Sequence, residues 1–121
     1  MKYMLLIYDD EREWGALSEA ERQKIYGEYR TLIEEISSKG QFLGGDQLQP
    51  TTTATSIRVR NGKQVTTDGP FAETREQLGG YFLIEAKDLD EANSIAGRIP
   101  SARLGTVEVR PVVETAAPAT A

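Results

Sequence analysis

Apolar side chains recur along the chain at two spacings, and the wider spacing predicts a long helix near the N-terminus. Residues 25–36 place apolar side chains three and four positions apart, which is the pattern of a helix face turned toward a core. Ser18 and Glu21 form a capping box, and Gly40 supplies the positive φ that ends the helix. The pattern therefore predicts one helix between these two signals.

The shorter spacing predicts strands, and a second helix follows late in the chain. Alternating side chains, or short runs that are apolar at every position, are typical of strands. The predicted strands comprise residues 2–8, 41–48, 56–60, 63–67, 81–86 and 106–113. Asn61-Gly62 is typical of a type I′ hairpin turn between the third and fourth of them. Residues 88–99 predict the second helix, which Pro100 stops.

The order of these elements predicts the fold class α+β. Outside the hairpin the elements follow the order βαββαβ, so we expect a ferredoxin-like fold with an inserted β-hairpin. Such a sheet carries both helices on one face, and residues 2–8 and 81–86 are apolar on the other face as well. A contiguous apolar face does not remain in water. We therefore expect a homodimer through the apolar sheet face, with the two sheets about 10 Å apart.

The length of the chain predicts a single domain, and its charge argues against nucleic acid as a partner. Its 121 residues fit one domain, predicted at 1–113, followed by a disordered Ala/Thr/Pro tail at 114–121. The formal charge of -5 comes without a Lys/Arg cluster, so we expect no direct nucleic-acid binding. No apolar run approaches the roughly 20 residues that span a bilayer, and the apolar N-terminus is too short for a signal peptide. We therefore expect a cytoplasmic protein with no membrane partner.

The absence of cysteine and histidine narrows the possible chemistry most. It removes thiolate nucleophiles, Cys-bound metals and the usual side chain for proton transfer near neutral pH. Gly44-Gly45 and Gly79-Gly80 lack the spacing of phosphate loops and are interpreted as bulges or turns. The acids at 9–11 lack the spacing of a calcium loop and are interpreted as solvated surface. We expect no cofactor and no metal, so any catalysis must use Asp, Glu, Tyr, Ser, Thr, Lys or Arg.

The segment VTTDGPFAETRE, at 65–76, is the most distinctive stretch of the sequence. Its Asp68 either locks a turn by accepting backbone N–H groups or acts as a general base at the mouth of a cleft. Arg75 either pairs with Asp68 or Asp46, or presents its guanidinium to a small anion. Glu73 favours the N-terminus of a helical turn that the segment predicts. The segment is therefore either architecture or the rim of a site.

Aromatic residues add candidates for packing or for contact with a ligand. Phe71 either fills the core or offers a platform to a ligand. Tyr29, on the apolar stripe of the long helix, and Tyr81, on a strand, need hydroxyl partners at the core edge. Trp14, in a predicted loop, either covers the core edge or contacts a partner chain. A polar-lined pocket between sheet and helices would draw on Tyr29, Tyr81, Asp46, Asp68 and Arg75.

Four motifs together resemble the DGPF-type proteins of the YCII-related family. They are GGDQL at 44–48, DGPFAETRE at 68–76, LGGYF at 78–82 and VEVRP at 107–111. The similarity runs from about residue 2 to residue 112. The resemblance implies a bacterial protein that forms a dimeric ferredoxin-like α+β barrel, in a family without a settled biochemical activity.

The resemblance also implies two settings for function. Genes of such proteins often lie beside those for extracytoplasmic-function sigma factors, which suggests a regulatory role. Many family members carry a His and an Asp in a cleft, which has suggested enzymatic chemistry. This chain has no histidine, and its Asp68 is matched to the acid of that pair.

Three functions remain open from the sequence. The first is binding of a small molecule or a protein partner in a regulatory, sigma-factor-associated setting. The second is a cofactor-independent enzyme of the lyase, isomerase or hydrolase type, with Asp68 as base and Arg75 or a Tyr hydroxyl stabilising an anion. The third is a dimeric protein-interaction module that uses Trp14. Because His and Cys are absent, the sequence favours the first over catalysis.

Overall fold

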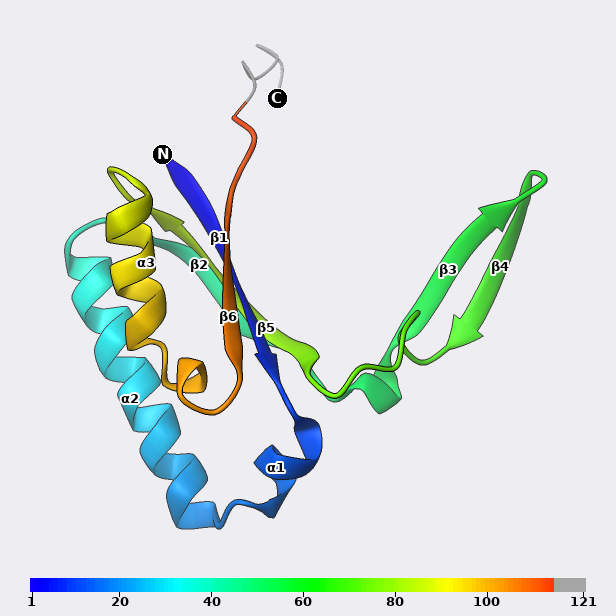
Figure 1. The fold of residues 1–121 in the computed structure, drawn as a ribbon, viewed down its shortest axis with the longest axis horizontal. Coiled ribbons are helices and arrows are strands. Elements are labelled where there is room, and N and C mark those ends of the chain that lie inside the picture. Colours follow the sequence, from blue (N-terminus) through cyan, green and yellow to red (C-terminus); the bar gives the residue numbers. More distant parts are fainter. Residues whose placement is uncertain (115–121) are drawn as a thin grey trace.

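A computed structural model describes residues 1–114 and confirms the α+β class (Figure 1). Four antiparallel strands form the main sheet in the order β2-β5-β1-β6. They are β1 (Lys2–Asp9), β2 (Phe42–Gln47), β5 (Gln77–Glu85) and β6 (Thr106–Pro111). Two helices, α2 (Glu19–Ser38) and α3 (Leu89–Arg98), cover one face of this sheet. No helix within residues 1–114 is long and apolar enough to cross a membrane.

Side-chain caps place the ends of the two long helices where the sequence predicts them. The Ser18 hydroxyl accepts from the backbone N–H of Glu21, whose carboxylate accepts from the Ser18 N–H. Gly40 has a φ of 70° after the last turn of α2. The Asp88 carboxylate caps α3 by accepting from the backbone N–H of Glu91. These caps satisfy N–H groups that a helix end leaves without partners.

The core lies between the helices and the inner face of the sheet. Strand β1 alternates, so Tyr3, Leu5 and Ile7 are buried against the helices, whereas Met4 and Leu6 are half-buried on the outer face. The buried cluster consists of Tyr3, Leu5, Ile7, Leu32, Ile36, Phe82, Ile84, Ala86, Ala92, Ile95, Ala96 and Ile99. It fixes the sheet against α2 and α3 and so positions the ends of the strands.

A two-stranded ribbon projects from this body. It consists of β3 (Thr55–Arg60) and β4 (Lys63–Asp68), which pair only with each other. Asn61 and Gly62 both have positive φ, as a type I′ turn requires. We call the ribbon the arm; it extends on the side of the main sheet away from α2 and α3 (Figure 1). A short 3-10 turn, η1 (Thr51–Thr53), precedes it.

Two predictions differ from the structure, and a third is not tested by it. The predicted loop at 9–17 contains a helix, α1 (Glu11–Ala16), because the Asp10 carboxylate caps it by accepting from the backbone N–H of Arg12. The helical turn predicted at 73–76 is absent, and this segment is a loop that leads into β5. Except for residue 114, the tail predicted at 114–121 lies outside the described residues.

Candidate functional site

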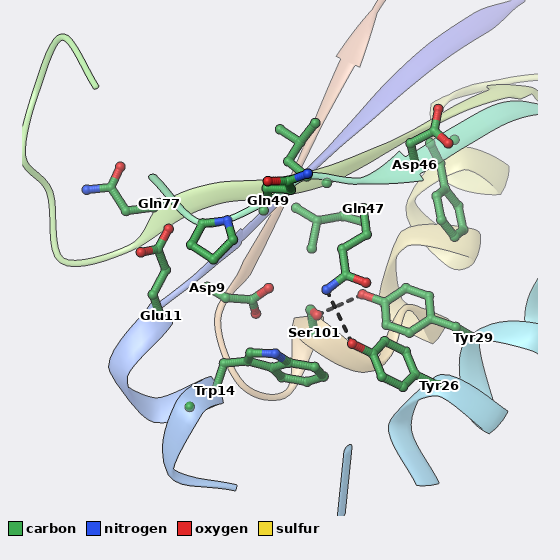
Figure 2. A pocket seen from close by; sticks show the side chains of 18 of the residues that line it. Asp9, Glu11, Trp14, Tyr26, Tyr29, Asp46, Gln47, Gln49, Gln77 and Ser101 are labelled. Carbon is green, nitrogen blue, oxygen red and sulfur yellow. Dashed lines mark hydrogen bonds between the residues drawn. The ribbon is translucent and has the colours of Figure 1, made fainter. Parts of the chain in front are cut away.

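A cavity of about 570 Å³ opens where the sheet meets α1 and the middle of α2 (Figure 2). Aromatic and aliphatic side chains supply much of its wall, and a few polar groups point into it. Its main apolar lining residues are Ile7, Trp14, Tyr26, Tyr29, Ile33 and Phe82. The last turn after α3, η2 (Pro100–Ala102), contributes Ser101. A mostly apolar concavity of this size suits a small organic molecule.

Asp9 stands on the floor of the cavity because it continues the inward-facing row of β1. It follows Ile7 by two residues, and side chains two apart on a strand share a face. Two glycines leave room for its carboxylate. A Cβ at Gly79 would lie 3.4 Å from Asp9 Oδ2, and one at Gly105 would lie 3.2 Å from Asp9 Oδ1. The carboxylate therefore lies between the backbone of Gly79 and the backbone of Gly105.

The surroundings of Asp9 raise its pKa above the ordinary value for Asp. Burial raises the pKa of Asp9, the Ser101 hydroxyl opposes that shift, and the negative charge of Glu76 adds to it. Within residues 1–114, no basic side chain forms an ion pair with Asp9. A half-buried carboxyl with a raised pKa and no cationic partner is a candidate for proton transfer.

Two hydroxyl groups lie beside Asp9. The Tyr29 hydroxyl and the Ser101 Oγ share a hydrogen bond of 2.7 Å (Figure 2). The Tyr29 ring is held from behind by an edge contact with Phe82, at 6.1 Å between ring centroids. Burial raises the pKa of Tyr29, Ser101 opposes the shift, and the charge of Asp9 adds to it. Tyr29 therefore keeps its proton and can act as a hydrogen-bond donor.

The wall opposite Asp9 is aromatic. Trp14 of α1 and Tyr26 of α2 meet edge to face with ring centroids 5.6 Å apart. The Gln47 side-chain amide donates to the Tyr26 hydroxyl at 3.4 Å, which links β2 to this wall (Figure 2). Trp14 therefore belongs to the cavity, and its ring is placed to contact a molecule bound there.

Acidic residues next to Asp9 hold α1 and η1 in place. Asp10 is only 7% exposed and forms ion pairs with the Nε atoms of Arg12 at 3.5 Å and Arg75 at 3.6 Å. Burial alone would raise its pKa, but hydrogen bonds from Arg12 and that residue's charge lower the pKa overall. The Glu11 carboxylate accepts from the N–H and the hydroxyl of Thr51, at 2.8 and 3.0 Å. The prediction that residues 9–11 are merely solvated surface is therefore wrong.

Three residues proposed from the sequence lie at or near the cavity. Tyr29 and Asp46 line it. Asp46 and Tyr81 are cross-strand partners, and the Tyr81 hydroxyl donates to Asp46 Oδ2 at 3.0 Å. That acceptor raises the pKa of the exposed Tyr81 hydroxyl. In Figure 2 the Asp46 carboxylate points away from Asp9 and Ser101, so the cavity does not bring these acids together.

The DGPF segment lies away from the cavity lining. Asp68 and Glu73 are exposed, and neither lines the cavity. Phe71 is 81% exposed, so the expectation that it fills the core is wrong. Arg75 pairs with Asp10 rather than with Asp68 or Asp46. The contact of this loop with the site is therefore indirect: its exposed Arg75 pairs with Asp10, the residue that caps α1.

The cavity can therefore offer a ligand the Asp9 carboxyl, the Tyr29 and Ser101 hydroxyls and aromatic surfaces. Further polar side chains in its lining are Glu11, Arg12, Asp46, Gln47, Gln49 and Gln77. Within residues 1–114, no group of three or more acidic side chains is placed to hold a metal ion. The residues best placed for chemistry, Asp9 and Ser101, were not predicted as site residues. The signal for Asp9 was its place in the alternating row of β1, two residues beyond Ile7.

We expect Tyr29→Phe to lower the free energy of unfolding by about 1–2 kcal/mol. The ring contact with Phe82 remains, but the buried Ser101 hydroxyl loses its 2.7 Å partner. Urea denaturation measures the change. The matched control is Tyr26→Phe, which loses only a 3.4 Å bond to Gln47 and should change stability by less than about 0.5 kcal/mol. Equal losses in the two variants would contradict the role assigned to the Tyr29–Ser101 bond.

Comparison with known proteins gives a family, a relative and a fold. The sequence profile of the YCII-related domain matches residues 1–116. The chain is 36% identical over 114 residues to the uncharacterized protein R00369 of Rhizobium meliloti (strain 1021), covering 93% of this chain and 92% of that one. It also resembles the solved structure of 5-chloro-2-hydroxyhydroquinone dehydrochlorinase (TftG) from Burkholderia phenoliruptrix AC1100 in complex with 2,5-dihydroxybenzoquinone. The TM-score is 0.53 and the identity 15%, covering 95% of this chain and 96% of that chain, so this likeness shows the fold alone.

Proposed function

The chain belongs to the YCII-related family, and we propose that it is an enzyme that binds an uncharged, ring-sized molecule and moves a proton on it with Asp9. One observation carries this proposal: a half-buried carboxyl with a raised pKa and no cationic partner stands on the floor of an aromatic-walled cavity. A structural carboxylate would gain stability from a basic partner, as Asp10 does. Within residues 1–114, Asp9 has no basic partner, which is typical of a carboxyl that takes part in catalysis.

Size and charge indicate the class of ligand. A cavity of about 570 Å³ with walls from Trp14, Tyr26 and Phe82 suits one ring or two small ones. An anionic ligand would bring its charge against Asp9, so an uncharged one fits better. Tyr29 and Ser101 share one hydrogen bond, which uses one of their two hydroxyl hydrogens. The other can point to the Asp9 carboxylate or to a hydroxyl or carbonyl oxygen on the ring.

The proton step that this arrangement supports is enolisation. The Asp9 carboxylate takes a proton from a ring carbon next to a carbonyl, and the electron pair of the C–H bond moves to form the C=C–O⁻ of an enolate. As the Asp9 carboxylate becomes protonated, the second hydroxyl hydrogen of the Tyr29–Ser101 pair turns from Asp9 to the developing oxygen anion and stabilises it. Asp9 then returns the proton to carbon or oxygen. Its raised pKa brings the carboxyl closer to the value that suits both steps.

The solved relative supports this ligand class. Its printed name describes a dehydrochlorinase of 5-chloro-2-hydroxyhydroquinone, and its bound molecule is 2,5-dihydroxybenzoquinone. Both are single rings with hydroxyl or carbonyl groups, which matches the ring size and the oxygen substituents proposed here. This support does not extend to charge, because the hydroxyls of a 2,5-dihydroxybenzoquinone are acidic. The regulatory setting near a sigma factor, the DGPF-type assignment, the bacterial origin and the cytoplasmic location remain predictions from the sequence.

We also propose that the fold is ferredoxin-like and that two copies of the chain form a dimer. The sheet order and the two covering helices support the ferredoxin-like assignment with the arm as the insertion. The outer sheet face carries the half-buried apolar side chains Met4, Leu6 and Leu83. Such a face supports a homodimer with sheets packed together, which would form the dimeric α+β barrel.

Trp14 gives a direct test of binding because it is the single tryptophan of the protein and lines the cavity. Hydroquinone is an uncharged probe of the proposed class. We expect it to quench Trp14 fluorescence with a saturable curve, after correction for absorbance by the probe. The matched anionic probe, 2,5-dihydroxybenzoate, should bind at least about tenfold more weakly because its charge faces Asp9. Quenching that stays linear in hydroquinone, as with free N-acetyltryptophanamide, would contradict the proposal.

A further inference from the structure

Gln47 and Tyr26 form a second polar pair in the cavity, in addition to Tyr29 and Ser101. Gln47 comes from β2 and Tyr26 from α2, and both side chains line the cavity (Figure 2). The Gln47 amide donates to the Tyr26 hydroxyl at 3.4 Å, which is longer than the usual range of about 2.7–3.2 Å. A bond this long is weak, so it exchanges readily for one to a bound molecule.

This pair has hydrogen-bonding capacity that the fold does not use. Gln47 carries a second amide hydrogen and a carbonyl oxygen, and the Tyr26 hydroxyl accepts from Gln47 and so keeps its own hydrogen to donate. Within residues 1–114, no other side-chain hydrogen bond engages either group. Tyr26 is half-buried and Gln47 is exposed, whereas Ser101 is buried, so the second pair lies nearer to solvent than the first.

The other polar side chains of the lining are less suited to a ligand. Apart from Asp9, the charged ones and Gln77 bond to residues outside the lining, in the pairs Glu11–Thr51, Arg12–Asp10, Asp46–Tyr81 and Gln77–Thr74. Gln49 lies beyond the end of β2, where the strand no longer positions it. Gln47 and Tyr26 are therefore the polar groups that are both held by regular elements and able to bond to a ligand.

We propose that Gln47 and Tyr26 recognise a second oxygen on the bound ring, so that Gln47 selects rings with two hydroxyl or carbonyl groups. This inference rests on the proposed function and narrows its substrate class. Tyr26 and Tyr29 are three residues apart on α2, so they are neighbours on one helix face, about 5–6 Å apart at Cβ. One oxygen of a ring can therefore meet Tyr29 while a second oxygen meets Tyr26 and Gln47. The ring itself lies against Trp14, which contacts Tyr26 edge to face.

The experiment compares two uncharged probes that differ at one substituent. Hydroquinone carries a second hydroxyl where 4-methylphenol carries a methyl group of similar size. Trp14 fluorescence gives a dissociation constant for each probe from the midpoint of its binding curve. We expect the ratio of the 4-methylphenol constant to the hydroquinone constant to fall about threefold to tenfold in Gln47→Met and in Tyr26→Phe, because each variant loses a hydrogen bond to the second hydroxyl. A general change in the cavity affects both probes alike and leaves this ratio unchanged.

The matched control is Gln23→Met, which makes the same replacement at an exposed residue of α2 outside the cavity lining and should leave the ratio unchanged. Resorcinol and 3-methylphenol form a second probe pair, with the second group one carbon nearer to the first. The two pairs together report where on the ring the second oxygen lies.

Two outcomes would overturn the inference, and they differ in what they say of the proposed function. If the probes bind saturably but neither Gln47→Met nor Tyr26→Phe changes the ratio for either pair, Gln47 and Tyr26 do not recognise a second oxygen, and the proposed function stands. If no probe gives a saturable curve with the unaltered protein, the proposed function fails and this inference fails with it.

Discussion

Replacing Asp9 by Asn should reduce proton-transfer activity by about 10²–10⁴-fold while leaving the protein at least as stable as before. The amide keeps the size and the place of the side chain between Gly79 and Gly105 but cannot take up a proton. The activity is followed by NMR as deuterium exchange, in D₂O, at the carbons next to the carbonyl of cyclohexanone. Absence of exchange above background with the unaltered protein would count against the proposal.

The stability of the same variant follows from the direction of the pKa shift. Because burial raises the pKa of Asp9 in the folded state, its contribution to stability is greatest at low pH. That contribution is lost as the pH rises through the raised pKa, since the folded state then holds a poorly solvated charge. At pH 7 we therefore expect Asp9→Asn to raise the free energy of unfolding by up to about 1 kcal/mol, a modest gain because solvent reaches part of the group. The gain should disappear below the ordinary pKa of Asp.

The matched control is Asp68→Asn, at the acid to which the sequence assigned the catalytic role. Asp68 is exposed at the base of the arm, where it pairs with Thr55, and it lies outside the cavity lining. Its replacement should change the exchange rate by less than about twofold and the stability by less than about 0.5 kcal/mol. If Asp68→Asn lost as much activity as Asp9→Asn, the catalytic site would include the DGPF loop, contrary to the proposal.

Gly105→Ala should lower the free energy of unfolding by about 3 kcal/mol. A Cβ at this position would overlap the carbonyl oxygen of Tyr8 and would lie 3.2 Å from Asp9 Oδ1. The start of β6, where Thr106 pairs with Tyr8, must therefore move away from β1. Urea denaturation measures the loss, and the displaced strand end should also weaken hydroquinone binding.

The matched control is Gly97→Ala in α3. A Cβ there would meet no atom within 4 Å, and alanine favours a helix over glycine. This variant should gain about 0.5–1 kcal/mol. A Gly105→Ala variant as stable as the unaltered protein would show that β6 does not approach β1 as closely as described.

The parts of the fold that were predictable depend on local signals. The capping box at Ser18, the turn at Asn61 and the cap at Asp88 each act through their own neighbours, so the sequence alone placed them. Helix α1 was missed because its capping residue, Asp10, was interpreted as part of a solvated acidic run. Six residues carry too little periodic signal to predict a helix.

The candidate site was harder to predict because it depends on contacts between distant segments. Asp9, Tyr29 and Ser101 come from β1, α2 and the turn after α3, and no spacing in the sequence joins them. The DGPF segment attracted attention for its composition, yet Phe71 faces outward and Arg75 bonds to Asp10. Without histidine the chain appeared poorly equipped for catalysis. We propose catalysis nonetheless, because Asp9 lies in the lining of an aromatic-walled cavity and burial raises its pKa.

The most direct test of the central claim is an NMR titration of the Asp9 carboxyl carbon, in the free protein and in the presence of hydroquinone. We predict that the pKa of Asp9 lies above the usual value for Asp, roughly 3.9, and that hydroquinone shifts this resonance in a saturable way. The carboxyl carbon of Asp68 should show no change on addition of the probe. An Asp9 pKa at or below the usual value, or an Asp9 signal that hydroquinone does not move, would contradict the account.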